Sequence, residues 1–114
     1  MTAYRLDKLI ILDRLGDDEE IFTMMIDMYL QDVENNCNNL SSLLASGDQA
    51  SLQREAHTVK GLLATFADED GAAMAAALEM RVKAGDLAQL EQPIAALQAR
   101  LREVAAVLQA EIAG

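Results

Sequence analysis

Residues 87–108 read LAQLEQPIAALQARLREVAAVL, and an aliphatic residue recurs in them at steps of three and four. These positions are Leu87, Leu90, Ile94, Leu97, Leu101, Val104 and Leu108. The alternation places one apolar stripe along a helix, and it is typical of the seams between helices in a four-helix bundle. Pro93 lacks a backbone amide hydrogen, so we expect either a kink there or a short turn followed by a helix that begins at Pro93.

A second apolar stripe runs through residues 17–46, which we predict to form a long helix. Its members, again at steps of three and four, are Phe22, Ile26, Tyr29, Val33, Cys37, Leu40 and Leu44. Because Cys37 belongs to this stripe, we interpret it as a small buried hydrophobe rather than a redox thiol. Met24, Met25 and Met28 could form an adaptable binding surface, but their helical spacing favours the interpretation that they fill the core.

The same periodicity predicts three further helices. One spans residues 4–14 and is expected to form a lid on the bundle, with an apolar side made of Leu6, Leu9, Ile10 and Leu12. The next spans residues 48–66. The last begins at Asp68 or Asp70, ends before Gly85, and directs inward Met74, Ala75, Leu78 and Val82.

A Gly-Asp dipeptide occurs at residues 16–17, 47–48 and 85–86, each time between two predicted helices. Glycine readily takes the left-handed conformation that ends one helix, and aspartate accepts hydrogen bonds from the free amides that begin the next. Glu20 and Gln89 follow two of these aspartates by three residues, which adds capping-box character. Such short junctions favour antiparallel packing of consecutive helices.

Composition agrees with this interpretation. Of the 114 residues, 52% are hydrophobic but only 4% are aromatic, and the apolar set consists mostly of residues that fill interfaces between helices. The length suits one core and is too short for a separate nucleotide-binding domain. We therefore predict an all-α fold, an antiparallel four-helix bundle with a short additional N-terminal helix, as a single domain over residues 1–114.

Charge and cysteine content exclude several classes of function. The formal net charge of −10 repels nucleic acids and anionic membrane surfaces. One cysteine and one histidine leave neither an intramolecular disulfide nor a nitrogen–sulfur metal cluster, so no metal site is expected. The chain begins without the apolar run of a signal peptide and has no stretch of about 20 apolar residues. We expect a soluble, cytoplasmic monomer without direct membrane contact.

The sole histidine, His57, lies in residues 54–61, which read REAHTVKG. At about 100° per residue, His57 falls about 150° from the middle of the apolar stripe of its helix, so it should point outward. That stripe consists of Leu52, Ala56, Val59, Leu63 and Phe66. Lys60 and Gly61 follow one turn later on the outer side, and the surrounding surface is completed by Gln53, Arg54 and Ala64.

These residue types suit phosphoryl transfer, which depends mostly on positioning and charge balance. A neutral imidazole nitrogen is a nucleophile, Lys60 can neutralise phosphoryl oxygens, and Gly61 removes a side chain that would obstruct a partner protein. The sequence contains no glycine-rich ATP loop, magnesium-binding aspartate cluster or nucleophile elbow. His57 would therefore carry phosphate without generating it from ATP.

The pattern Ala56-His57-Thr58-Val59-Lys60-Gly61, within five predicted helices, resembles the histidine-containing phosphotransfer (HPt) family of bacterial multistep phosphorelays. The resemblance extends to Leu78-Glu79 and Ala84-Gly85-Asp86. It implies that His57 is phosphorylated, that Lys60 assists, that Gly61 gives access and that Glu79 orients the histidine ring. The implied partners are the receiver domains of response regulators. They would bind to the surface formed by Gln53, Arg54, Lys60, Gly61 and Ala64.

The resemblance also implies that the chain needs no cofactor of its own, and that magnesium belongs to the partner receiver domain. A free-standing phosphocarrier and a cytoplasmic part of an inner-membrane hybrid sensor kinase both fit. Thr65-Phe66 echoes the phosphotransfer domain of chemotaxis-type histidine kinases, which stays open as a subclass. Two departures are bulky Leu62-Leu63 after the glycine, where relatives have small residues, and Ala67, where relatives often have glycine.

Two other functions remain open from the residues alone. The chain could be a non-catalytic helical interaction module in which His57 is incidental. It could also be an independent enzyme in which His57 is a general base, with Glu79 as the carboxylate partner and a concave pocket around both.

Overall fold

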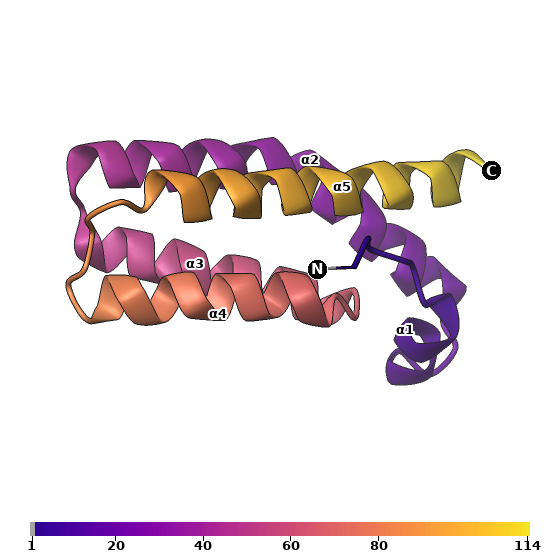
Figure 1. The fold of residues 1–114 in the computed structure, drawn as a ribbon. Coiled ribbons are helices and arrows are strands. Elements are labelled where there is room, and N and C mark those ends of the chain that lie inside the picture. Colours follow the sequence, from indigo (N-terminus) through magenta and orange to yellow (C-terminus); the bar gives the residue numbers. More distant parts are fainter. Residues whose placement is uncertain (1) are drawn as a thin grey trace.

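Five helices make up the regular secondary structure of residues 2–114, the part of the chain that the computed structural model describes. They are α1 (Lys8–Arg14), α2 (Glu19–Ser46), α3 (Gln49–Thr65), α4 (Glu69–Lys83) and α5 (Glu91–Ala113). The last four lie side by side with alternating directions, and α1 lies apart at one end, next to the start of α2 (Figure 1). This confirms the predicted antiparallel four-helix bundle with a short additional N-terminal helix. No helix within residues 2–114 is long and apolar enough to cross a bilayer.

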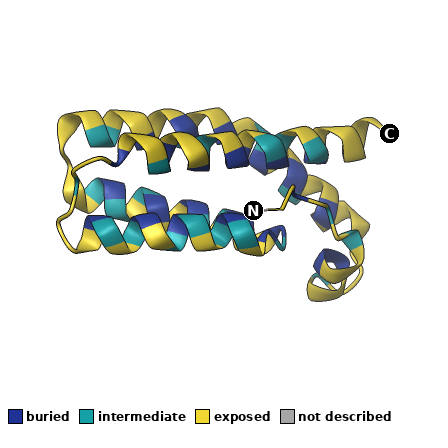
Figure 2. Cartoon of the chain, viewed as in Figure 1, coloured by how far each residue is buried: buried dark blue, intermediate teal, exposed yellow. Residues whose placement is uncertain are grey.

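The two predicted stripes of residues 22–44 and 87–108 supply about half of the buried apolar residues of the core (Figure 2). All predicted members are buried except Leu44 and Leu87, which are half-buried at one end of the bundle. Cys37 is completely buried, as predicted. The interpretation of the methionines was wrong for Met24 and Met28, which are each 60% exposed, whereas Met25 is half-buried and packs against the core. Met24 and Met28 lie two residues, or about 200°, from neighbouring core positions of α2 and so face outward.

Aspartates cap the first four helices, although not always the predicted aspartates. Asp48 caps α3 as expected, with its carboxylate accepting from the Ser51 amide at 3.1 Å. At the first junction Gly16 and Asp17 both have positive φ, so α2 begins one residue late, after Asp18. Glu20 is therefore the second residue of α2 and not the third, as a capping box requires.

The third Gly-Asp junction does not start a helix directly. Gly85 has a φ of 81°, but Asp86 accepts from Arg81 instead of capping, and α5 begins only at Glu91. Gln89 therefore lies outside the helices, and the capping box predicted there is absent. Pro93 falls in the first turn of α5, where its missing amide hydrogen has no intrahelical partner to lose. This corresponds to the predicted turn ahead of a helix near Pro93.

The N-terminal helix is shorter than predicted, because α1 begins at Lys8 and Asp7 is its cap. Its apolar side is also different. Leu9 and Ile10 are 80% and 45% exposed, whereas Ile11 and Leu12 are buried. Seven residues make only two turns, too few for a periodic pattern to decide which side packs against α2.

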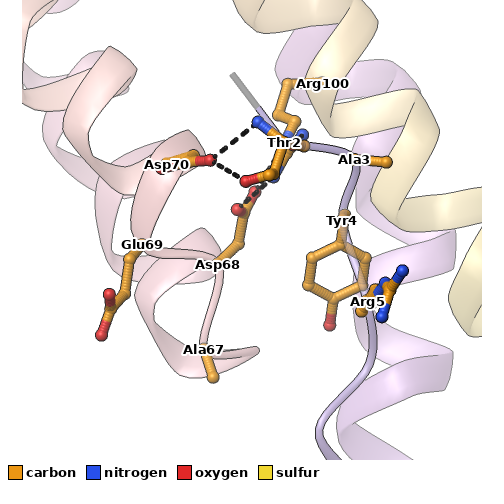
Figure 3. Close-up of a pocket in the computed structure, with 9 residues that line it drawn as sticks. All are labelled: Thr2, Ala3, Tyr4, Arg5, Ala67, Asp68, Glu69, Asp70 and Arg100. Atoms are coloured by element: carbon orange, nitrogen blue, oxygen red, sulfur yellow. Dashed lines mark hydrogen bonds and ion pairs between the residues drawn. The ribbon is translucent and has the colours of Figure 1, made fainter.

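The residues before α1 form an extended segment that crosses the end of the bundle. The buried Tyr4 hydroxyl donates to the Phe66 carbonyl at 2.9 Å, and Arg100 donates to the Thr2 carbonyl at 2.7 Å. Arg100 also makes a buried, two-pronged ion pair with Asp68, at 2.7 and 2.8 Å (Figure 3). The segment thus joins α5 to the turn between α3 and α4.

Candidate functional site

His57 lies near the middle of α3 with its side chain 66% exposed. The apolar stripe of the same helix is buried, from Leu52 to Phe66. The structure therefore places the imidazole on the outward side that the helical spacing predicts. A molecule approaching from solvent can reach the ring.

Glu79 of α4 joins His57 to Lys60. Its Oε2 atom lies 3.0 Å from His57 Nδ1, and its Oε1 atom accepts a hydrogen bond of 2.8 Å from Lys60 Nζ. Because α3 and α4 are antiparallel neighbours joined by a short turn, His57 and Glu79 face each other at equal distances along the chain from Asp68. The two oxygens of one carboxylate are thus divided between the two α3 residues.

The charge of Glu79 decides which nitrogen of the His57 ring carries the hydrogen in their contact. The hydrogen bond from Lys60 is the main reason why the pKa of Glu79 lies below its usual value. Desolvation opposes this effect, and the contact with His57 adds a smaller downward effect. An ionised carboxylate accepts hydrogen bonds and donates none. Nδ1 of His57 therefore carries the hydrogen in this contact, so that in a neutral ring the lone pair lies on Nε2.

The exposed surface of α3 on the C-terminal side of His57 carries small side chains at Gly61 and Ala64. Gly61 is exposed, and a Cβ atom added there would meet nothing within 4 Å. Ala64, one turn further, is also exposed, and its carbonyl accepts from Arg14 at 3.1 Å. Small side chains thus leave the approach to the ring open on this side.

On the other side of His57 lies an open hollow of about 320 Å³. Its lining residues are Gln53, Arg54, His57, Thr58 and Glu79. Arg54 is exposed and donates to the Ser51 hydroxyl at 3.0 Å. The predicted surface residues therefore surround the imidazole, with Gln53 and Arg54 before it and Lys60, Gly61 and Ala64 after it.

The two departures from the family pattern have structural explanations. Leu63 is buried in the core and Leu62 is half-buried, so neither bulky side chain needs to cover His57. Ala67 has a φ of 58° in the turn between α3 and α4, a conformation that glycine adopts at less cost. The glycine of relatives thus corresponds to a left-handed position that this chain retains with alanine.

Every residue of this site except Thr58 is predicted from the sequence, but the pairing of Lys60 with Glu79 is not. Lys60 was assigned to phosphoryl oxygens alone, whereas its ammonium group contacts the carboxylate. The sequence does predict that these residues lie close together. Because α3 and α4 are antiparallel and joined by a turn near Asp68, residues near 79 lie opposite residues near 57.

The family model of the Hpt domain matches residues 24–107, and the chain belongs to this family. Its members perform histidine phosphotransfer in phosphorelays, as phosphocarriers rather than conventional enzymes. Among solved structures, the HPT domain of a sensor hybrid histidine kinase from Shewanella has the same fold, with a TM-score of 0.81. The two chains are 17% identical, and the match covers 95% of this chain and 93% of the other. Curated protein sequences give no match.

Proposed function

We propose that His57 is the phosphoacceptor and that Nε2 is the atom that carries the phosphoryl group between receiver-domain aspartates. The contact of Nδ1 with Glu79 carries this proposal, because it leaves Nε2 as the unprotonated nitrogen of an exposed ring. A neutral nitrogen can attack phosphorus without first losing a proton.

In the forward step, the Nε2 lone pair forms a bond to phosphorus while the bond between phosphorus and the aspartyl oxygen breaks. The donor aspartate leaves as a carboxylate, and the phosphorylated ring, which still carries hydrogen on Nδ1, becomes cationic. Glu79 then faces a positive charge, which its carboxylate stabilises. In the return step, the carboxylate of a second receiver attacks phosphorus, the N–P bond breaks, and the ring becomes neutral again.

Lys60 and Gly61 support this transfer in different ways. Lys60 keeps Glu79 ionised beside the reacting ring, whereas Gly61 leaves room for the receiver to approach. Docking would use Gln53, Arg54 and Ala64 together with these two residues. Arg54, Gly61 and Ala64 are exposed, and Gln53 and Lys60 are half-buried. The receiver would bring its own magnesium and acidic pocket, and a hybrid sensor kinase is a fitting source of the phosphoryl group. We also propose that the chain carries out this transfer as a monomer.

Incubation of the chain with a phosphorylated receiver domain tests this proposal. The chain should acquire phosphate that is labile in acid and stable in alkali, as expected of phosphohistidine, and His57→Gln should acquire none. Lys83→Gln, which changes an exposed residue of α4 outside the site, serves as a control and should be labelled normally. Equal labelling of His57→Gln would place the phosphate elsewhere. Absence of labelling by every receiver tried would favour a non-catalytic interaction module.

A further inference from the structure

Two cations share the outward side of α3 with His57, and they differ in what they bind. Lys60 follows the histidine by one turn, and its ammonium group is held by Glu79 at 2.8 Å. That carboxylate is only 18% exposed, so the ion pair is partly shielded from water. For Lys60 to reach a phosphoryl group on Nε2, it would have to give up this bond to a poorly hydrated carboxylate.

Arg54 precedes the histidine by one turn and is not committed in this way. Its one hydrogen bond is to the Ser51 hydroxyl, and no carboxylate of residues 2–114 lies within ion-pair distance of it. A guanidinium group has five N–H donors in a planar fork. Most of these donors therefore remain available, in the geometry that matches two oxygens of a phosphoryl group.

The hollow beside the imidazole favours the same residue. Arg54 lines it together with His57 and the Glu79 carboxylate, and Lys60 is absent from its lining within the described part of the chain. Its volume of about 320 Å³ exceeds by far the roughly 30 Å³ that one water molecule occupies, so a tetrahedral group fits there. The Nδ1 edge of the ring is occupied by Glu79, which leaves the other edge to face an incoming group.

Charge balance adds a third argument. Lys60 and Glu79 cancel each other, and the unphosphorylated imidazole is neutral in the reactive state. Arg54 interacts with the Asp48 carboxylate at longer range but makes no ion pair within residues 2–114, so it is a less compensated positive charge than Lys60, in a chain of net charge −10 that otherwise repels a phosphoryl dianion.

On the basis of the proposed function, we infer that Arg54 is the catalytic cation that contacts the phosphoryl oxygens as they move between the aspartyl oxygen and His57 Nε2. Lys60 is a positioning residue, which acts on the imidazole through Glu79. The two cations thus have separate tasks, Arg54 at the phosphoryl group and Lys60 at Glu79.

Rates of transfer from a phosphorylated receiver test this division, with the chain at saturating concentration so that weaker docking does not limit the rate. Arg54→Gln should lower the maximal rate about tenfold or more, which corresponds to about 1.4 kcal/mol of transition-state stabilisation. Arg54→Lys should retain an intermediate rate, because an ammonium group keeps the charge but loses the fork. Lys83→Gln carries the same loss of one exposed charge and should leave the rate unchanged.

Two spectroscopic measurements separate Arg54 from Lys60. The ³¹P resonance of the phosphorylated chain should shift in Arg54→Gln and stay in place in Lys60→Gln. The carboxyl ¹³C titration of Glu79 should show a raised pKa in Lys60→Gln and no change in Arg54→Gln. An Arg54→Gln rate equal to that of Lys83→Gln would overturn the inference, as would a ³¹P shift that responds to Lys60 alone. If the unsubstituted chain is never phosphorylated, the proposed function itself has failed.

Discussion

Oε2 of Glu79 lies 3.0 Å from Nδ1 of His57, so a carboxylate from α4 holds the imidazole of α3 by one edge. This single contact decides both the orientation of the ring and the nitrogen that is left free. Its consequences for transfer and for stability can be measured separately.

Substitutions of Glu79 should separate orientation from charge. Glu79→Gln keeps an oxygen that accepts from Nδ1 but removes the negative charge, whereas Glu79→Ala removes both. We expect transfer to slow moderately in Glu79→Gln and by about tenfold more in Glu79→Ala, since hydrogen bonds to charged groups contribute about 1.5–3 kcal/mol. Single-turnover labelling of His57 measures both rates. Equal rates in the two variants would show that orientation by this contact is unimportant.

The lowered pKa of Glu79 predicts how the stability of the chain depends on pH. In the unfolded chain the pKa of a glutamate is about 4.3, and in the folded chain the pKa of Glu79 is lower. The ionised group therefore contributes stability that is fully present above the unfolded value and is lost as pH falls through the folded one. Urea unfolding should show that the difference in free energy of unfolding between the unsubstituted chain and Glu79→Gln is smaller at pH 2 than at pH 5. A difference that grows with acid would contradict the lowered pKa.

Gly61 should respond to substitution in opposite ways for folding and for transfer. A Cβ atom at this exposed helical position meets open space, so Gly61→Ala should stabilise the chain by about 0.5–1 kcal/mol through higher helix propensity. Gly61→Trp should fold as well but transfer poorly, because the indole would obstruct the receiver. Thermal melting and phosphotransfer on the same samples measure both effects. Unimpaired transfer by Gly61→Trp would remove the steric role of the glycine.

Ala67→Gly should stabilise the chain although it adds a glycine. Ala67 has a φ of 58°, where an L-residue is disfavoured by about 1–2 kcal/mol, and the greater entropy of glycine in the unfolded chain offsets part of this. We expect a net gain of about 0.5–1 kcal/mol. Ala73→Gly, at an exposed position inside α4, is the matched control and should destabilise by about 1 kcal/mol. Chemical denaturation measures both; a loss of stability in Ala67→Gly would contradict the left-handed turn.

The buried ion pair should matter far more than an exposed one on the same helix. Arg100→Met leaves the Asp68 carboxylate buried without its partner, and we expect a loss of about 3–5 kcal/mol. Arg102→Met removes the pairing with Glu34, in which both side chains are more than half exposed, and should cost less than about 1 kcal/mol. Urea denaturation compares the two variants. Similar losses would mean that Asp68 finds other partners when Arg100 is absent.

The long helices were predictable because their apolar residues repeat over many turns. The stripes through Phe22 and Leu97 each contain seven members, so a shift in phase would have been evident. The two turns of α1 offered no such redundancy, and Leu9 was placed on the wrong side for that reason. The burial of Arg100 could not be predicted from the sequence. Its partner, Asp68, is 32 residues away, and the sequence around Arg100 does not distinguish a buried arginine from an exposed one.

The site was predictable in part for a similar reason. The outward position of His57 follows from its angle to the stripe, a local property of one helix. The bond between Lys60 and Glu79 instead depends on how α3 and α4 face each other, which involves residues 19 apart and side-chain conformations that a periodic pattern does not encode.

Cys37 is the single cysteine of the chain, it is completely shielded from solvent, and desolvation raises the pKa of its thiol. Thiol reagents attack through the thiolate, so this side chain should stay inert toward them while the bundle is folded. A fluorophore or spin label could thus be attached to one cysteine introduced at Thr58, beside the reacting histidine, without first removing the native thiol. The encounter with a receiver could then be followed in real time.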